Sequence, residues 1–185
     1  DLTAYSIILG ICEDRLPFLI DLANPAPGAL LVAADQNSGK TRLLKSLLAS
    51  AIYLNSPDEV AFYIISKFPW QFNELEQSDH CQGSYPAHEK ETLRELVIEL
   101  AAMVDERKQA APHGPAILLV IDDLHTFLLN IDEQTFSSLY WLIRHGPRSR
   151  IWTIAALSTQ LSEQFDERFL AAFRTRLIGK IDDRK

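Results

Sequence analysis

The sequence predicts an α/β fold in which helices flank a mainly parallel sheet, because strand-like and helix-like segments alternate along the chain. One apolar run, 29–34, passes through a short polar turn into Gly-Lys-Thr at 39–41 and then into a leucine-rich helix. A second run, 116–121, is apolar throughout and ends in Asp122 and Asp123, as expected of a central strand covered on both faces. Ligands of such sheets bind at the carboxyl ends of strands, so both features predict a site at that edge.

The segment that precedes this core predicts a β-hairpin. Residues 5–12 and 18–22 are short apolar runs joined by a charged turn. A loop rich in Pro and Gly follows at 24–28 and delivers the chain into the buried strand at 29–34.

The remaining elements follow from the same periodicities. The expected strands are 59–66, 151–157 and 177–181, and the expected helices are 40–54, 88–109, 132–145 and 166–174. Residues 67–86 contain Pro69, Gly83 and Pro86 and lack a regular pattern. We interpret them as a long surface excursion with one helical turn near 72–75.

Composition limits the classes of partner. The formal net charge of −7 argues against a broad nucleic-acid surface, although DNA could contact a local basic patch or a ring channel. No apolar run reaches the roughly 18–20 residues that span a bilayer, and no signal peptide is recognisable. Cys12 and Cys81 lack metal-ligand spacing and suit free thiols in a reducing cytosol, so we expect no structural zinc and a cytoplasmic location. Because the first residue is Asp1, we expect a piece of a longer chain, whose other parts could carry a membrane anchor.

Gly-Lys-Thr between a buried strand and a helix is typical of a phosphate-binding loop. Backbone N–H groups would converge on phosphate oxygens, Lys40 would reach the β and γ oxygens, and Thr41 would hold Mg²⁺. The residues expected to bind the nucleotide are Asp35, Gln36, Asn37, Ser38, Gly39, Lys40 and Thr41. The usual motif opens with a glycine where this chain has Ala34. The alternative interpretation is a polar turn with an exposed lysine.

Asp122 and Asp123 supply the acidic half of a nucleotide-hydrolase signature. Asp122 would bind the metal ion, commonly through water. Asp123 stands where a carboxylate would polarise the attacking water, but its side chain is one methylene shorter than that of glutamate. Reach matters here, because a displacement of about 1 Å can cost on the order of a hundredfold in rate. The alternative role of Asp123 is to cap the turn that follows.

Two further features near the last core strand are candidates for catalysis. Gln160 follows that strand and could sense the γ-phosphate or position water, although a polar residue there can simply begin a loop. Arg148 and Arg150 could reach the phosphate of a neighbouring subunit as an arginine finger. The alternative is that both arginines are solvated loop charges.

Five stretches occur in a fixed order along the chain. They are 9–10 with 19–22; 30–34 running into 38–41; 56–60; 99–103 with 106–107; and 120–124 leading to 151–156 and 159–160. Together they resemble the ATP-binding motor domain of the FtsK/SpoIIIE family, from about residue 7 to residue 181. This collinear order is far more specific than the phosphate loop alone.

The resemblance implies a RecA-like P-loop NTPase core, ATP and Mg²⁺ as ligands, and self-association into a hexameric ring. Members of the family pump double-stranded DNA, and a sister branch, the type VII secretion ATPases, drives protein export. We therefore expect one domain over residues 1–185, with 1–28 as the hairpin lead-in and 29–181 as the nucleotide-binding core.

The chain departs from the family pattern around the expected site. Ala34 replaces a glycine, Asp123 replaces a glutamate, Ser66 replaces an aspartate, and Leu161-Ser162 replaces Arg-Pro. These departures imply a site that binds ATP and hydrolyses it slowly. Such degenerate domains are familiar in the secretion branch, which the acidic charge also suits better than DNA pumping.

Three functions remain open from the sequence. The first is an ATPase motor that moves double-stranded DNA or a secreted protein. The second is a non-catalytic nucleotide-binding or assembly module of a multi-domain secretion-type ATPase. The third and weakest is a small-molecule kinase, because no basic lid segment follows the acidic strand.

Overall fold

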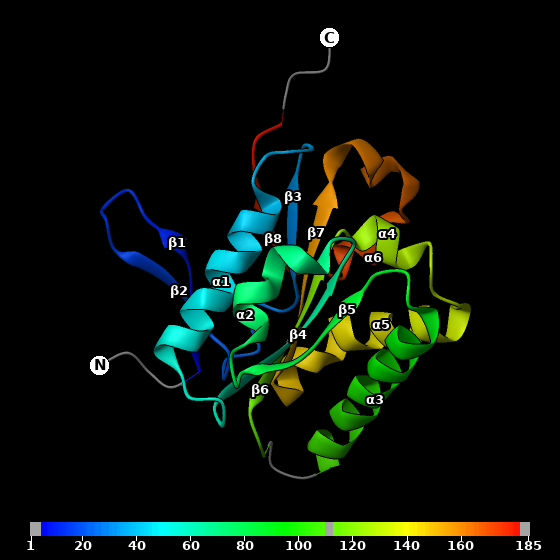
Figure 1. Cartoon of the computed structure of the whole chain (residues 1–185), viewed down its shortest axis with the longest axis horizontal. Coiled ribbons are helices and arrows are strands. Elements are labelled where there is room, and N and C mark those ends of the chain that lie inside the picture. The colour runs from blue at the N-terminus through cyan, green and yellow to red at the C-terminus, as the bar shows by residue number, and fades with distance from the viewer. Residues whose placement is uncertain (1–4, 110–112, 182–185) are drawn as a thin grey trace.

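Six parallel strands form the central sheet of the computed structural model, which describes residues 5–109 and 113–181 (Figure 1). In spatial order the strands are β5 (Cys81–Pro86), β4 (Val60–Ser66), β6 (Ala116–Asp122), β7 (Ile151–Ser158), β3 (Leu30–Ala34) and β8 (Thr175–Ile178). All five neighbouring pairs are parallel. The predicted α/β fold with a mainly parallel sheet and an N-terminal hairpin is therefore confirmed.

The strand order brings three predicted site segments together. β7 lies between β3 and β6, although it follows both of them in the chain. The carboxyl ends of β3, β7 and β6 therefore lie side by side at one edge of the sheet. Every residue of β6 except Asp122 is buried, as the unbroken apolar run predicts for a central strand.

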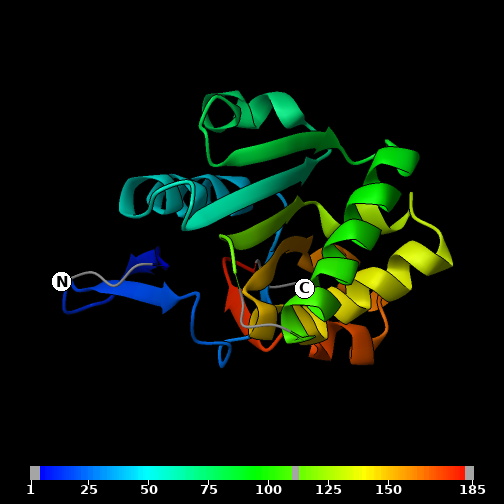
Figure 2. The ribbon, with the colours of Figure 1, turned by 90° about the horizontal axis from the view of Figure 1, so that it is seen from below.

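Helices cover both faces of the sheet (Figures 1 and 2). On one face lies α1 (Lys40–Leu54), which buries Leu44, Leu47, Leu48 and Ala51 at the predicted helical spacing. On the other face lie α3 (Lys90–Gln109) and α5 (Glu133–His145), which pack against each other, and α5 also packs against β7. Two apolar clusters result, one on each side of the sheet. Within the described ranges, no helix is both long enough and apolar enough to cross a bilayer.

The predicted hairpin is a separate two-stranded sheet of β1 (Ser6–Ile11) and β2 (Pro17–Asp21). It packs on α1 through Ile7, Leu9 and Ile20, which share the apolar cluster of that helix. Asn55, at the end of α1, ties the hairpin down: its side chain accepts from the Tyr5 N–H and donates to the Ser6 carbonyl, each at 2.9 Å. The hairpin is thereby held beside the helix that begins at Lys40.

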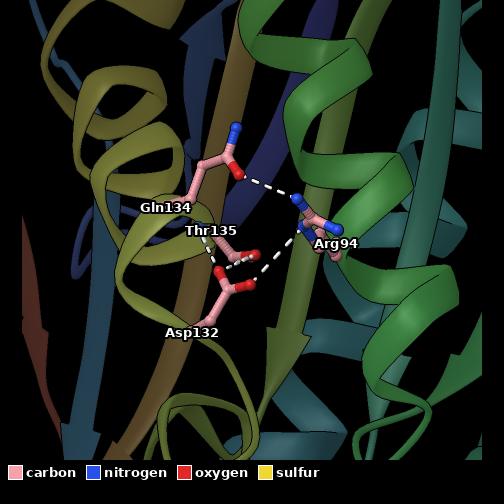
Figure 3. A network of polar contacts seen from close by, with 4 residues as sticks. All are labelled: Arg94, Asp132, Gln134 and Thr135. Atoms are coloured by element: carbon pink, nitrogen blue, oxygen red, sulfur yellow. Dashed lines mark hydrogen bonds and ion pairs between the residues drawn. The ribbon is translucent and has the colours of Figure 1, made fainter.

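A polar network at the start of α5 joins it to α3 (Figure 3). The Asp132 carboxylate caps α5 by accepting from the backbone N–H and the hydroxyl of Thr135, each at 2.7 Å. Arg94 of α3 contacts Asp132 at 3.5 Å and donates to the Gln134 side chain at 2.8 Å. These hydrogen bonds, chiefly those from Thr135, hold the pKa of the Asp132 carboxyl below its usual value.

The segment 67–86 differs from the predicted irregular excursion. It contains the short helices η1 (Pro69–Phe72) and α2 (Asn73–Glu76), and its last six residues form the edge strand β5. An edge strand buries little, so β5 carries no alternating apolar pattern and tolerates Gly83 and a terminal Pro86. The one helical turn expected near 72–75 is confirmed by α2.

Other boundaries also differ. The last strand is Thr175–Ile178 rather than 177–181, and the preceding helix α6 covers only Glu167–Ala171. The short helices α4 (Leu124–Leu128), η2 (Gly146–Ser149) and η3 (Thr159–Gln164) were not predicted. Each has two turns or fewer, which is too short for apolar periodicity to reveal.

Candidate functional site

A cavity of about 450 Å³ lies at the carboxyl edge of the sheet. The predicted site residues that line it are Gln36, Asn37, Lys40, Thr41, Asp122, Asp123 and Gln160. Ser38 and Gly39 line a smaller cavity of about 200 Å³, to which Lys40 also belongs. Asp35 lines neither cavity and is only 6% exposed. The topology thus gathers residues from three separate strand ends around one polar cavity.

The loop between β3 and α1 has a backbone that suits its sequence. Gly39 has φ 86°, the left-handed conformation that glycine adopts without a side-chain clash, and α1 begins at the next residue. Ala34, in contrast, is the last residue of β3 and is absent from the described residues with positive φ. The methyl group that replaces the usual glycine therefore stands on extended backbone, where any residue is tolerated.

A close approach between strands accommodates that methyl group. Gly179 follows β8 and donates its N–H to the Ala33 carbonyl at 2.9 Å. A Cβ added at Gly179 would lie 2.9 Å from the Ala34 Cβ, closer than carbon atoms normally approach. Alanine at 34 therefore fits because its neighbour across the strands is glycine.

Lys40 is the residue that directly follows the loop, and its side chain folds back onto the loop backbone. Its ammonium donates to the carbonyls of Ala34, at 3.0 Å, and Asp35, at 2.8 Å. Partial burial lowers the pKa of Lys40, and the nearby charges of Asp122, Asp123 and Asp35 oppose that shift. A lysine ammonium at a helix N-terminus can bind phosphate oxygens. The carboxylates beside it can bind a metal ion.

Asp122 and Thr41 form the centre of the site. The Thr41 hydroxyl lies 3.1 Å from both carboxylate oxygens of Asp122 and donates to them. The Ser66 hydroxyl, from the neighbouring strand in register with Asp122, lies 3.4 Å from one of these oxygens. Burial raises the pKa of Asp122, while the two hydroxyl groups oppose that shift. Serine at 66 thus supplies a donor to Asp122 where an aspartate would add a second negative charge.

Asp123 has the geometry of a helix cap. Its φ is 81°, and its carboxylate accepts from the backbone N–H of Thr126 at 3.2 Å and from the Thr126 hydroxyl at 2.7 Å. Both bonds satisfy donors at the start of α4. The capping role considered above is therefore present, and the role of Asp123 toward water stays a prediction.

The end of β7 supplies the remaining predicted residue. Gln160 is exposed and lines the large cavity, while Thr159 donates its hydroxyl to the Asp35 carboxylate. Arg148 and Arg150 precede β7, so they lie at the opposite edge of the sheet, ~23 Å away at about 3.3 Å per residue. Any contact of theirs with a phosphate would therefore require a second subunit.

Sequence reasoning missed part of the lining. Lys67, Phe68, Gln71, His125 and Thr126 also border the large cavity. Lys67 directly follows β4, and the carboxyl end of that strand was a usable signal. Phe68 and Gln71 enter through the turn η1, which has no sequence signature for a site.

The arrangement defines a class. A parallel sheet, a strand–loop–helix segment with Lys and Thr at the helix start, and an acidic strand end beside that threonine make this a P-loop NTPase fold.

Comparisons with known proteins agree with a P-loop NTPase fold and identify the family within that class. The FtsK/SpoIIIE family profile matches residues 6–113, more than half of the chain, so the chain belongs to the FtsK/SpoIIIE family. The ESX-5 secretion system protein EccC5 of Mycobacterium marinum is 30% identical over 98 residues, which is 53% of this chain and 7% of that protein. The ESX-3 protein EccC3 of Mycobacterium tuberculosis is 29% identical over 126 residues, or 61% of this chain and 9% of that protein. The chain thus spans less than a tenth of these relatives.

Solved structures share the fold at low sequence identity. EssC (ATPases 2 and 3) from Geobacillus thermodenitrificans superposes with a TM-score of 0.81 at 14% identity, over 97% of this chain and 38% of that one. The conjugation coupling protein TcpA of pCW3 gives 0.75 at 15% identity, over 99% of this chain and 56% of that one. The predicted RecA-like P-loop core is consistent with both structures.

Proposed function

We propose that this domain binds ATP with Mg²⁺ and hydrolyses it slowly. The observation that carries the proposal is the contact between Thr41 and Asp122, made beside Lys40 in a cavity of about 450 Å³. Hydroxyl and carboxylate oxygens are the ligands that Mg²⁺ prefers, so this pair fits the ion. When bound, Mg²⁺ would neutralise charge on the β- and γ-phosphates.

The residues of the loop have distinct proposed roles. Asp35, Gln36, Asn37, Ser38 and Gly39 form the turn that would surround the phosphates, and Lys40 exchanges its two carbonyl contacts for phosphate oxygens. The Asp35 N–H donates to the Lys180 carbonyl at 3.1 Å, so the N–H groups toward the phosphates come from later residues of the turn. Thr41 and Asp122 hold the metal ion, the first through its hydroxyl and the second through its carboxylate.

Asp123 and Gln160 are proposed to orient the attacking water, because both side chains border the cavity. Asp123 can do this only by loosening its cap on α4, since its carboxylate already accepts from Thr126. That competition adds to the short reach of aspartate, and it is the physical reason to expect slow turnover.

The smaller cavity is proposed to receive the nucleoside. It lies on the side of the loop away from Asp122, and its apolar lining includes Leu9 of the hairpin, Leu43 of α1 and Ile178 of β8. Ile178 is 68% exposed, so its side chain is accessible to a base that enters this cavity. The hairpin, in the lead-in segment 1–28, would thereby complete a nucleotide site that is otherwise formed by the core of residues 29–181.

We further propose that the moved substrate is a secreted protein. Curated relatives at 29–30% identity are named as secretion system proteins, and the formal net charge of −7 disfavours a DNA track. In a ring, Arg148 would be the candidate to reach the cavity of the next subunit, because it is exposed, whereas the Arg150 guanidinium lies over the Tyr5 ring of its own chain. Within the longer protein, the domain would lie in the cytoplasm, where ATP is supplied.

The test is a comparison of the wild type with Lys40→Ala. Mg-ATP binding by calorimetry and phosphate release should both be measurable for the wild type and lost in the variant. Lys108→Ala is the matched control, because Lys108 lies on α3 with its ammonium over Trp141 and away from the cavity. Absence of ATP binding by the wild type would refute the proposal. Tight binding of double-stranded DNA at physiological salt would instead favour a DNA motor.

A second candidate function is a non-catalytic module that binds ATP to stabilise an assembly. The capping of α4 by Asp123 favours it, because a carboxylate held by two donors is poorly placed to act on water. Mg-ATP binding that raises the oligomer mass in light scattering, with no phosphate release, would select this function over the first.

A further inference from the structure

The phosphate loop contains a negative charge of its own. Asp35 is its first residue after β3 and is almost completely buried. A carboxylate in this loop repels a polyphosphate of the same sign and attracts the lysine that should bind it. Lys40 is close enough to feel this charge, because its ammonium already donates to the Asp35 backbone carbonyl at 2.8 Å. The loop therefore needs a device that keeps this carboxylate away from the ligand.

The sheet register supplies a partner for that carboxylate. Ala34 and Ser158 are the last paired residues of β3 and β7, so Asp35 and Thr159 are the next residues on adjacent strands. The Thr159 hydroxyl donates to the Asp35 carboxylate, although the two residues are 124 positions apart. Thr159 is itself fixed, because its carbonyl accepts from the Ser162 hydroxyl at 2.7 Å at the start of η3.

We propose that Thr159 is a positioning residue that acts through Asp35: its hydroxyl holds the Asp35 carboxylate off Lys40 and off the bound phosphates. The inference rests on the proposed nucleotide binding. Thr159 touches neither phosphate nor metal; it keeps Lys40 available for them. Because Gln160 is the next residue, the same contact also fixes the start of the turn that brings Gln160 to the cavity.

The alternative partner for a released carboxylate is at hand. The Lys40 ammonium lies 2.8 Å from the Asp35 carbonyl, so a carboxylate that leaves Thr159 has a cation nearby with which it can form an ion pair. Such a pair would occupy the ammonium and place negative charge beside the phosphates. Both effects weaken nucleotide binding, and both disappear when the charge on residue 35 is removed.

The experiment measures the Kd for Mg-ATP in a double-mutant cycle. Thr159→Val removes the hydroxyl at nearly constant volume and is expected to weaken binding about tenfold, which corresponds to ~1.4 kcal/mol. Thr159→Ser keeps the hydroxyl and is expected to restore binding to within about threefold of wild type. Asp35→Asn is expected to tighten binding severalfold, and Thr159→Val is expected to have little effect in the Asp35→Asn background, since the charge that it releases is gone.

Controls separate positioning from general destabilisation. Thr135→Val removes an equivalent hydroxyl-to-carboxylate bond at the cap of α5, outside the cavity (Figure 3), and should lower Tm without changing the Kd. Wild-type affinity in Thr159→Val, or weak binding that persists in the double variant, would overturn the role of Thr159. The proposed nucleotide binding would stand in either case. Weakened binding by Asp35→Asn would also overturn it, even if Thr159→Val fails to fold. If no variant and no wild type binds Mg-ATP, the proposed function itself is refuted.

Discussion

The Thr41 hydroxyl lies 3.1 Å from both carboxylate oxygens of Asp122, although the two residues are 81 positions apart. The contact exists because β3 and β6 end at the same edge of the sheet, separated only by β7. Burial makes the charged aspartate costly and the Thr41 hydroxyl offsets part of that cost, while the same pair of side chains suits a metal ion. The same carboxylate therefore reduces stability and supports the proposed function.

Asp122→Asn tests this trade-off. Burial raises the pKa of the Asp122 carboxyl, so its charged form opposes folding, and an amide of the same shape should stabilise the protein without Mg²⁺. We expect Tm to rise by roughly 2–4 °C, the change that about 1 kcal/mol produces in a domain of this size. Differential scanning fluorimetry should also show that Mg-ATP no longer stabilises the variant. A lower Tm would mean that the charge is better compensated than its surroundings indicate.

The pair Ala34 and Gly179 is expected to be energetically coupled. A methyl group at Gly179 would lie 2.9 Å from the Ala34 Cβ, so Gly179→Ala should destabilise the protein by about 1–3 kcal/mol through overpacking. In the Ala34→Gly background, most of this cost should vanish, because the opposing methyl group is gone. Urea denaturation of the four proteins measures the coupling. Equal costs in both backgrounds would show that the strands do not approach as closely as described.

Asp123→Glu separates the reach of the carboxylate from its capping role. Glutamate should lose part of the cap on α4 and strain the backbone at φ 81°, at a cost of about 1 kcal/mol. If a short carboxylate limits hydrolysis, steady-state phosphate release should increase at least tenfold, ~1.4 kcal/mol of activation free energy. Asp132→Glu is the matched control, because it makes the same change at the cap of α5. Turnover that stays at the wild-type rate would favour the assembly module.

The nucleoside cavity makes a prediction about ligand selectivity. If Leu9, Leu43 and Ile178 contact the base, Ile178→Asp should weaken Mg-ATP binding about tenfold and leave tripolyphosphate binding unchanged, because only the base is affected. Leu129→Asp changes a comparably exposed leucine, which does not line this cavity. Equal losses for both ligands would show that the substitution disturbs the phosphate loop rather than the base.

The two cysteines should differ in reactivity. Cys12 is exposed in the hairpin turn, whereas Cys81 is half-buried at the start of β5, where burial raises the pKa of its thiol. A disulfide reagent at pH 8 should therefore label one thiol quickly and the second slowly. Cys12→Ser should remove only the fast phase, and denaturant should make both thiols fast. Rapid labelling of Cys81 in the native protein would contradict the partial burial of its thiol.

Strong local patterns determined much of the fold. The apolar runs of β3, β6 and β7 and the leucine spacing of α1 are long and regular, so the strands and helices that bear them lie where they were predicted. The loop 35–39 and Asp122 were identified for the same reason, since the loop directly follows a buried strand and Asp122 ends another. The edge strand β5 escaped prediction and the last strand was predicted with shifted bounds, because edge strands bury little and carry no comparable pattern.

Contacts between residues distant in sequence required the tertiary structure. The sequence marked Ala34 as a missing glycine, but only the approach of Gly179 explains why a methyl group fits there. It placed Asp123 in the acidic pair, but only the backbone of α4 commits its carboxylate to Thr126. No sequence pattern indicated a partner for Asp35, whereas the strand order brings the Thr159 hydroxyl to its carboxylate. Local residue patterns determine which elements form, whereas strand order and register decide which side chains meet at the carboxyl edge of the sheet.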